Sequence, residues 1–329
     1  MEKKIRAKIT GISSYVPDFI LTNEELSKMV DTSDEWIMSH VGIKERHILK
    51  GPGKATSDMG AEAVKKLLKK TGTKPEEIDL LICGTVTPDM FFPATACLIC
   101  GKTDIKNAFA FDTNSGCCGF IYTLSVGARY IESGRYKKVI IVGADMNSSM
   151  VDYTDRATSP LFGDAAGAVL LEPTTEELGV MDEQMGVDGS GWTHLHIKAG
   201  GSLMRHTHET IENNLGCIYM EGQSVFKWAV IKMADVAEEI IKRNGLDSKK
   251  VWLLPHQANL RIIDAVENRI SFDKEKVLVN IEKYGNTSAA TIPLVLSDFE
   301  HKFKKGDDLA FCSFGAGFSW GAIWLKWAY

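Results

Sequence analysis

The sequence predicts an internally duplicated α/β fold, in which helices cover sheets whose strands are buried on both faces. Continuous apolar runs at residues 78–83 and 139–142 are typical of such strands, because a strand covered on both faces keeps no polar side. Helical patterns alternate with these runs. The segment 72–83 also aligns without gaps on the segment 245–256, and each follows an amphipathic helix, which indicates a repeated unit.

Length and composition exclude several classes of protein. The 329 residues suit two domains or one large α/β unit, and 44% hydrophobic with 25% charged residues is typical of a soluble globular protein. We expect no membrane span and no secretory signal, because no apolar run approaches about 18 residues and the start of the chain lacks an apolar core. The net charge of −5 disfavours nucleic acid as a partner, and the odd count of seven cysteines favours free thiols in a reducing cytoplasm.

In the first half of the chain, strands alternate with two expected helices. The strands are expected at residues 78–83, 108–111, 139–142 and 166–171. Ser57 is the expected N-cap of a helix that runs to about residue 70 and ends at a Thr-Gly pair. A second helix is expected over residues 118–132, where a Ser-Gly pair ends it.

The second half repeats this order. The helix expected at 225–243 corresponds to the one at 57–70, and further matches pair 109–117 with 277–287 and 139–144 with 309–316. Any two βαβ units share a general resemblance, but the gapless register favours a true duplication. Residues 173–222 break the pattern with many glycines and four of the eight histidines, so we expect a loop-rich connection there.

Cys117 is the first candidate for chemistry. It lies between a predicted strand and a predicted helix, in the run Asn-Ser-Gly-Cys-Cys-Gly-Phe. Unpaired N–H groups and the helix dipole at such a position favour a thiolate, and the small neighbours admit a substrate carbonyl. A cysteine at such a turn is nevertheless more often a small packed residue. Cys118 is rotated by about 100° around the helix and is expected to be part of the core.

Two further candidates lie in the second half. His256 directly follows a predicted buried strand at 251–254, where open α/β sheets place ligands, although a structural role fits equally well. Asn286 stands in a Tyr-Gly-Asn-Thr-Ser turn that corresponds to the Cys117 turn, and such an asparagine usually only forms or caps a turn. If the halves face each other across a pseudo-twofold axis, the two turns approach one another beside His256.

The remaining motifs carry less weight. The glycine-rich segment 314–321 follows a predicted strand and can supply an oxyanion hole, or form only a tight turn. Cys97 and Cys100 have apolar neighbours, which favours buried thiols over a metal site. The histidines of segment 194–208 lack helical spacing and a nearby carboxylate pattern, so we expect a loop cluster and no metal site.

Together these segments resemble β-ketoacyl-acyl carrier protein synthase III, of the thiolase superfamily. The motifs that carry the resemblance are Asp112-x-Asn114-x-x-Cys117-x-Gly119-Phe120, Pro255-His256-Gln257-Ala258-Asn259-x-Arg261, Tyr284-Gly285-Asn286-Thr287-Ser288-Ala289-Ala290 and Phe314-Gly315-Ala316-Gly317-x-x-Trp320-Gly321. Further matches lie at 29–37, 42–47, 155–156 and 162–164, so that only parts of 173–222 are not covered. The order Cys, His, Asn favours this branch over relatives that pair a cysteine with two histidines.

The resemblance implies a thiolase-like, five-layered αβαβα fold in a cytoplasmic homodimer. Its N-terminal half would span 1–172 and carry the nucleophile, and its C-terminal half would span 173–329. Acyl-CoA, usually acetyl-CoA, would condense with malonyl-acyl carrier protein to initiate type II fatty acid synthesis, with release of CoA and carbon dioxide. The CoA thioester is a substrate, and no metal or organic cofactor is implied.

The resemblance also implies roles for single residues. Cys117 would attack the acyl thioester, while the N–H groups of Cys117 and Ala316 hold the oxyanion. His256 and Asn286 would donate hydrogen bonds to the malonyl thioester carbonyl, so that decarboxylation leaves a stabilised enolate. The binding residues implied are Trp36 and Arg156 for adenine, Asn259 and Gln223 for pantetheine, Phe162 for the acyl pocket, Phe92 for the partner's acyl pocket, and Arg261 and Lys227 for the acidic carrier protein.

Three positions depart from the family pattern. His40 replaces a frequent arginine near the CoA phosphates, Asn147 is unusually polar for the acyl pocket, and Ala316 replaces a frequent glycine. One alternative function is a condensing enzyme or acyltransferase of secondary metabolism with a different acceptor. A cysteine hydrolase with a Cys117–His256 pair and a non-catalytic CoA-binding protein are the others.

Overall fold

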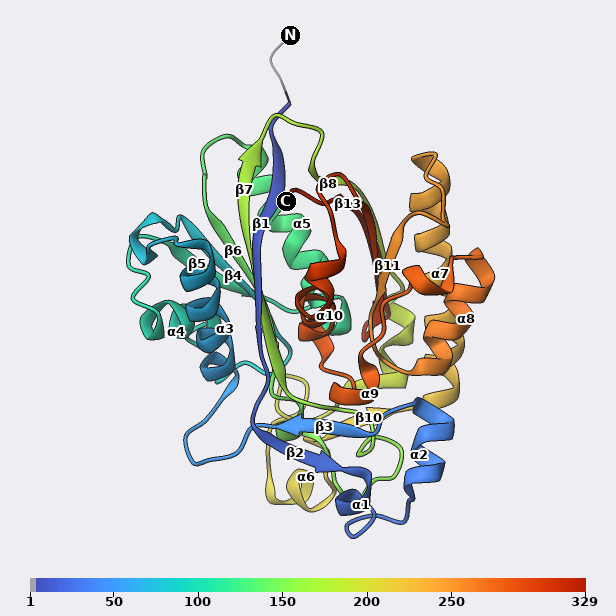
Figure 1. Cartoon of the computed structure of the whole chain (residues 1–329). Coiled ribbons are helices and arrows are strands. Elements are labelled where there is room, and N and C mark those ends of the chain that lie inside the picture. Colours follow the sequence, from blue (N-terminus) through green and yellow to red (C-terminus); the bar gives the residue numbers. More distant parts are fainter. Residues whose placement is uncertain (1–3) are drawn as a thin grey trace.

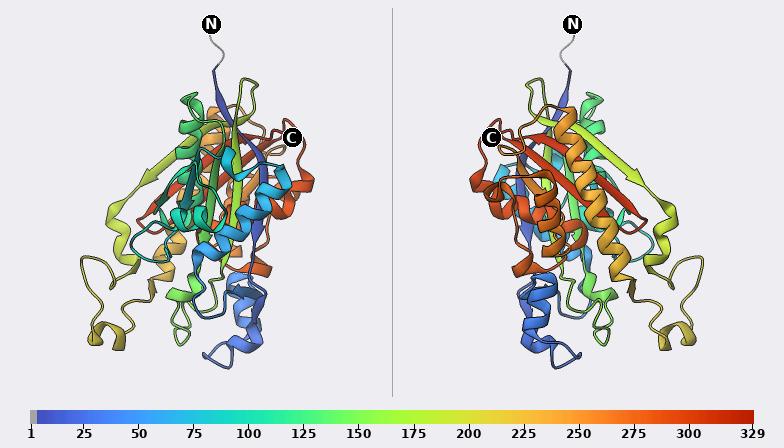
Figure 2. Two further views of the ribbon diagram at one scale, coloured as in Figure 1. Left: turned by 90° about the vertical axis from the view of Figure 1, so that its left-hand side faces the viewer. Right: turned by 90° about the vertical axis from the view of Figure 1, so that its right-hand side faces the viewer.

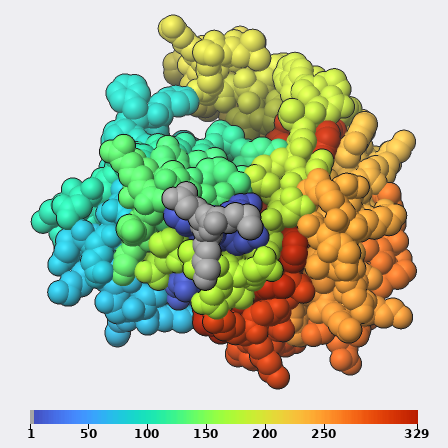
Figure 3. Space-filling view, turned by 90° about the horizontal axis from the view of Figure 1, so that it is seen from above, coloured from blue at the N-terminus to red at the C-terminus, as the bar shows by residue number. Residues whose placement is uncertain are grey.

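Helices and sheets alternate in five layers in the computed structural model, which describes residues 4–329. Figure 1 shows two outer helix layers, α3 with α4 and α7 with α8, and a central layer of α5 and α10 between the two sheets. The predicted duplicated α/β fold is therefore confirmed. Seen from above, the blue-to-green first part of the chain lies beside the orange-to-red last part (Figure 3).

The first sheet has five strands in the order β1-β7-β6-β4-β5. Their bounds are Arg6–Tyr15 for β1, Leu80–Gly84 for β4, Phe109–Thr113 for β5, Val139–Asp145 for β6 and Ala165–Thr174 for β7. Strand β4 is parallel to both β5 and β6, and every residue of β4 and β6 is buried, as their apolar runs predict. Strand β5 is the edge, and its side chains are at least partly exposed.

The second sheet repeats this order. It runs β11-β12-β13-β8, with bounds Gly179–Val187 for β8, Trp252–Pro255 for β11, Asp308–Gly315 for β12 and Ser319–Lys326 for β13. A parallel bridge from Leu253 to Val277 adds the counterpart of the β4–β5 pairing. Strands β1, β7, β6 and β4 thus correspond to β8, β13, β12 and β11. The internal alignment predicts the pairs β4–β11 and β6–β12.

The helices follow the same repeat. The bounds of the helices in the layers are Thr56–Thr71 for α3, Thr95–Lys102 for α4, Gly119–Glu132 for α5, Gly222–Arg243 for α7, Leu260–Ile270 for α8 and Thr291–Phe299 for α10. The central helices α5 and α10 contribute Phe120, Leu124 and Val295 to a core that both sheets share. Burial on both sides holds these helices rigidly, and with them the turns that precede them.

Helix α3 begins earlier than expected and ends where the sequence predicts. Its N-cap is Ala55, and Ser57 lies inside the first turn, so the expected Ser57 cap is wrong. The Ser57 hydroxyl donates instead to Asp89 at 2.6 Å, a partner that local sequence does not reveal. The helix ends at Gly72 with a φ of 68°, a left-handed conformation that glycine adopts without strain. The helix expected at 118–132 begins at Gly119, after a 3-10 turn at Gly116–Cys118.

The expectation of a loop-rich connection at 173–222 is wrong in part, because β8 forms a full strand of the second sheet. The rest holds the hairpin of β9 (Leu195–Ile197) with β10 (Ile218–Met220) and the short helix α6 (His208–Glu212). Both views of Figure 2 show this yellow segment at the lower end, with the blue N-terminal elements. The remaining elements there are β2 (Phe19–Thr22), α1 (Asn23–Leu26), α2 (Asp34–Val41), β3 (Glu45–Ile48) and α9 (Ile281–Tyr284).

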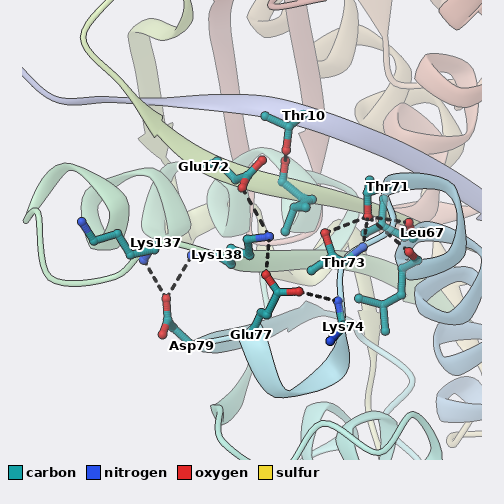
Figure 4. Close-up of polar contacts among 12 residues, drawn as sticks. Thr10, Leu67, Thr71, Thr73, Lys74, Glu77, Asp79, Lys137, Lys138 and Glu172 are labelled. Carbon is teal, nitrogen blue, oxygen red and sulfur yellow. Dashed lines mark hydrogen bonds and ion pairs between the residues drawn. The ribbon is translucent and has the colours of Figure 1, made fainter.

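Polar contacts tie the entries of the parallel strands together (Figure 4). Asp79, just before β4, accepts hydrogen bonds from the N–H groups of Lys137 and Lys138 at 2.7 and 3.0 Å. The Lys138 ammonium also pairs with Glu77 at 2.9 Å and Glu172 at 3.7 Å. Such exposed ion pairs contribute little, so the hydrogen bonds of Asp79 are the stronger constraint on how β4 and β6 enter the sheet. No helix within residues 4–329 has the length and apolar character needed to cross a membrane.

Candidate active site

Four turns from separate parts of the chain meet at one cavity of about 780 Å³. Cys117 follows β5, His256 follows β11, Asn286 follows α9 and Ala316 follows β12. Because the two halves face each other across α5 and α10, the ends of equivalent elements come together here. The structure therefore brings the three predicted catalytic side chains and the predicted oxyanion turn to one place.

The backbone around Cys117 is closely packed against the turn that carries Ala316. Gly116 has a φ of 54°, and a β-carbon there would lie 3.1 Å from the nitrogen of Ala316. A β-carbon at Gly315 would lie 2.7 Å from the nitrogen of Cys117. The Ser313 hydroxyl donates to the carbonyl of Cys117 at 2.8 Å. The backbone turns that carry Cys117 and Ala316 are thus in close contact, which suits an oxyanion hole made from their N–H groups.

The surroundings of Cys117 act on the pKa of its thiol in opposite directions. Burial raises the pKa of Cys117 to about 12, whereas hydrogen bonding by Ser288 and Asn286 lowers it. The expectation that the start of the helix favours a thiolate stays a prediction, because burial and hydrogen bonding act on this thiol in opposite directions. Cys118 is fully buried and its sulfur donates to the carbonyl of Ser319, so the expectation that it belongs to the core is confirmed.

His256 is buried and neutral. Its backbone N–H donates to Cys312 at 2.8 Å, which continues the pairing of β11 with β12 past the end of the strand. Its side chain is 1% exposed, and neither ring nitrogen has a hydrogen-bond partner among residues 4–329. Burial lowers the pKa of His256 to about 3. An imidazole of this kind keeps one N–H to donate to a molecule in the cavity.

Asn286 is held so that its amide nitrogen is the end that faces the cavity and Cys117. Its Oδ1 accepts from the N–H of Ser288 at 2.9 Å, and its own N–H donates to the carbonyl of Leu161 at 2.8 Å. The Nδ2 group is left to donate into the cavity, on the side where the carboxamide also lowers the pKa of Cys117. Ser288 has a φ of 51°. It was not predicted as a residue of the site, although it belongs to the same Gly-Asn-Thr-Ser motif as Asn286.

The polar Asn147 has a structural task beside this turn. Its Nδ2 donates to the carbonyl of Gly163 at 2.8 Å and to that of Asn286 at 3.4 Å. Phe162 forms a bridge to Asn286, and both Phe162 and Asn147 line the cavity. The hairpin of β9 and β10 also lines it, a contribution from segment 173–222 that the sequence patterns did not indicate.

The mouth of the cavity carries polar and charged side chains. Gln223, Asn259, Arg261 and His40 line it, whereas Lys227 is exposed on α7 outside it. Asn259 caps helix α8 through its Oδ1 and donates from its Nδ2 to the carbonyl of His40 at 3.2 Å.

Trp36 and Arg156 lie against each other beside the mouth. The guanidinium carbon of Arg156 is 4.3 Å from the centre of the Trp36 ring, and the His40 ring stacks on Trp36 at 4.3 Å. Neither Trp36 nor Arg156 lines the cavity itself. A flat base can enter between them only if the guanidinium moves away from the indole.

Phe92 does not reach the cavity of its own chain. It is 84% exposed, beside Phe91 at 82%, and the edge strand β5 adds the exposed Phe109.

Cys100 is buried but Cys97 is exposed, so the expectation of two buried thiols is wrong for Cys97. No group of three or more histidine, cysteine or acidic side chains placed to hold a metal is found in the part of the chain that the structure describes.

Comparisons with known proteins agree with this geometry. The family model described as 3-Oxoacyl-[acyl-carrier-protein (ACP)] synthase III matches residues 111–189, and the model of its C terminal region matches 241–327. The chain is 57% identical to beta-ketoacyl-[acyl-carrier-protein] synthase III 2 of Bacteroides thetaiotaomicron, over 99% of this chain and 98% of that protein.

Solved structures lead to the same family. The 3-oxoacyl-[acyl-carrier-protein] synthase III of Aquifex aeolicus is 41% identical, with a TM-score of 0.90 over 98% of this chain and 100% of that one. The priming beta-ketosynthase from the R1128 polyketide biosynthetic pathway is 31% identical, with a TM-score of 0.90 over 98% of this chain and 96% of that one.

Proposed function

This chain belongs to the β-ketoacyl-acyl carrier protein synthase III family of the thiolase superfamily, and we propose that Cys117, His256, Asn286 and Ala316 carry its reaction. Membership makes it a condensing acyltransferase with a thiolase-like fold, as the sequence motifs predict. The observation that carries the assignment of residues is the cavity itself. It is lined by Cys117, Ala316, Asn286 and His256, and the ring nitrogens of His256 have no hydrogen-bond partner within residues 4–329.

In the first half-reaction the sulfur of Cys117 attacks the carbonyl of an acyl-CoA. The N–H groups of Cys117 and Ala316 hold the oxyanion of the tetrahedral intermediate. Collapse breaks the bond to the CoA sulfur, and the proton of the Cys117 thiol ends on the released CoA. Because the pKa of this thiol is raised, the proton leaves as the thioester is attacked rather than before. The product is acyl-Cys117 and free CoA.

In the second half-reaction the malonyl thioester of malonyl-acyl carrier protein enters the cavity that CoA has left. His256 and Asn286 each donate a hydrogen bond to the malonyl thioester carbonyl. Loss of carbon dioxide leaves two electrons on the α-carbon, and both donors stabilise the resulting enolate. The enolate carbon then attacks the carbonyl of acyl-Cys117 and forms the β-ketoacyl-acyl carrier protein. The bond to the Cys117 sulfur breaks, and the thiolate that leaves takes up one proton from water. A neutral histidine suits this role, because it donates without carrying a charge into the buried site.

The mouth residues suggest how both substrates dock. The adenine would stack between Trp36 and Arg156 once the guanidinium moves off the indole, with Asn259 and Gln223 along the pantetheine arm. Exposed Arg261 and Lys227 on adjacent helices offer positive charge to an acidic carrier protein. Acetyl-CoA is the proposed primer, with a pocket beside Phe162 and Asn147. No metal or organic cofactor takes part in this scheme.

A homodimer in the cytoplasm is part of the proposal. Strand β5 is an unpaired sheet edge, and Phe109 on it is exposed, as are Phe91 and Phe92. An exposed edge of this kind favours pairing with the same strand of a second copy. The exposed Phe92 would then enter the acyl pocket of the partner and limit the length of the primer.

A panel of primers and acceptors tests the proposal. We expect condensation with malonyl-acyl carrier protein to be faster with acetyl-CoA than with isobutyryl-CoA or longer acyl-CoA. The likeness to a polyketide priming enzyme supports one alternative, a condensing enzyme with another acceptor, and turnover only with such an acceptor would establish it. Release of CoA without any acceptor would instead identify a hydrolase, and binding without turnover a CoA-binding protein.

A further inference from the structure

Asp145, the last residue of β6, is a fully buried carboxylate outside the proposed catalytic set. Its two oxygens face different parts of the chain. Oδ1 accepts from Val86 N–H at 2.8 Å, from the Thr85 hydroxyl at 2.9 Å, and from the N–H and hydroxyl of Thr87 at 3.2 and 3.1 Å. Oδ2 accepts from Ala289 N–H at 2.9 Å. The Ser288 side chain also hydrogen-bonds to Asp145, so this carboxylate is bonded twice to the turn that carries Asn286.

This turn sits in a space that only glycine leaves open. A β-carbon at Gly143 of β6 would collide with the carbonyl oxygen of Ala289. A β-carbon at Gly119, the first residue of α5, would lie 2.8 Å from the β-carbon of Ala289. Ala289 thus lies between β6 and α5, and the hydrogen bond to Asp145 draws it inward. The depth at which the turn sits depends on this bond.

Within the turn, the position of Asn286 depends on the position of Ala289. Ser288, the neighbour of Ala289, donates its N–H to Oδ1 of Asn286 and so fixes where Nδ2 points. A displaced Ala289 moves Ser288, and with it the carboxamide. Cys117 is held differently, by the Ser313 hydroxyl and the close packing of Gly315. The backbone of Cys117 thus has supports of its own, whereas its sulfur receives hydrogen bonds from Ser288 and Asn286 of the turn.

We propose that Asp145 is a positioning residue for the condensation half-reaction, because its Oδ2 holds the turn that aims Asn286 at the substrate. The inference rests on the proposed function. It assigns to Asp145 no contact with substrate and no effect on the oxyanion hole. The charge of Asp145 also raises the pKa of Cys117. Removal of that charge should therefore not slow the acylation of Cys117, whereas the decarboxylation of the malonyl group should slow when the turn moves.

The variant Asp145→Asn is a selective probe. Its single carbonyl oxygen has four donors to satisfy on the Oδ1 side, so its NH₂ group turns toward Ala289. Two N–H donors then face each other, and the turn is pushed outward at almost unchanged side-chain volume. Misplacement of a catalytic group by about 1 Å can cost about a hundredfold in rate. We expect a loss of that size in condensation and malonyl decarboxylation, with single-turnover acylation by acetyl-CoA close to wild type.

Two other variants complete the test. Thr85→Val removes one donor from Oδ1 and leaves the Ala289 bond, so both half-reactions should stay near wild type. Gly143→Ala pushes the same turn from the side of β6 and should reproduce the split, which keeps the test decisive if Asp145→Asn does not fold. Equal loss of both half-reactions in a folded Asp145→Asn, or no loss in either, would overturn the proposal. Absence of acylation in the wild-type protein would instead overturn the proposed function.

Discussion

The side-chain oxygen of Asn286 accepts a 2.9 Å hydrogen bond from the N–H of Ser288, two residues further along the same turn. This bond decides which end of the carboxamide faces the cavity. The oxygen is already engaged, so the amide nitrogen is the end offered to a substrate. A turn-forming asparagine, unremarkable by its local sequence, becomes a fixed donor opposite Cys117.

Asn286→Asp tests this donor with little change in volume. The carboxylate can still accept from Ser288 but has no N–H to donate, and its charge repels the forming enolate. Loss of such a donor costs about 10²–10³ in rate. We expect malonyl decarboxylation and condensation to fall by that factor, measured with malonyl-acyl carrier protein, while acylation of Cys117 persists. Condensation at the wild-type rate would remove Asn286 from the mechanism.

The buried His256 makes stability depend on pH in a defined window. Its pKa is lowered from 6.5 to about 3, so between these values the unfolded chain binds a proton here and the folded chain does not. Stability is therefore lost as the pH falls below 6.5, by up to about 1.4 kcal/mol per pH unit.

His256→Gln removes this dependence and leaves the other titrating groups in place. The difference in unfolding free energy between wild type and this variant should shrink by about 2 kcal/mol from pH 7 to pH 5. Urea denaturation of both proteins at several pH values measures it. A difference that stays constant over this range would mean that His256 is not buried as a neutral imidazole.

The contact between Trp36 and Arg156 predicts that the KM for an acyl thioester depends on whether the thioester carries the CoA nucleotide. Trp36→Ala removes the indole face, and a stacking or cation–π contact is worth about 1–2 kcal/mol, so the KM for acetyl-CoA should rise about tenfold. Acetyl-N-acetylcysteamine lacks the nucleotide and serves as the control, with an unchanged KM. A rise with both thioesters would show that Trp36 acts on the fold of α2 instead.

His40 offers the complementary change. His40→Arg adds a permanent cation beside Trp36, at the position where the family often has arginine. An exposed ion pair with a phosphate is worth up to about 1 kcal/mol, so the KM for acetyl-CoA should fall a few-fold at low salt. The effect should disappear at high salt and with acetyl-N-acetylcysteamine. A salt-independent change would point to altered stacking on Trp36.

The exposed edge at β5 predicts how the protein associates. Phe109→Asp places a charge on this edge, 41% exposed in the single chain, and should yield monomers in sedimentation velocity experiments. Ile20→Asp, on β2 at 38% exposure, is the matched control and should remain dimeric. Dimers with Phe109→Asp, or monomers with Ile20→Asp, would place the interface elsewhere.

The positions of Cys117, His256 and Asn286 were predictable because each follows an element that the chain repeats. The repeat states which turns are equivalent, and equivalent turns meet at the pseudo-twofold axis. Strand β8 escaped prediction because its middle, Asp182 to Gln184, is polar and only partly buried at its place in the sheet. Because such a strand has no continuous apolar run, the local sequence does not predict it.

Other differences come from contacts made across long distances in the chain. The cap expected at Ser57 failed because Asp89, a distant residue, captures its hydroxyl. Burial raises the pKa of Cys117, and the hydrogen bonds that lower it come from Ser288 and Asn286 in the other half of the chain, which no local pattern reveals. Asn147 looked misplaced in an acyl pocket, yet its amide supports the backbone of Gly163 and Asn286.

Intact-mass analysis of the protein before and after malonyl-acyl carrier protein is added tests the mechanism most directly. Acetyl-CoA alone should load one acetyl group, found on the peptide that contains Cys117, and malonyl-acyl carrier protein should discharge it into a β-ketoacyl product. Cys118→Ala should behave as wild type, and Cys117→Ala should take no label. An acetyl group on any other residue, or one lost to water at the same rate without the malonyl substrate, would contradict the account.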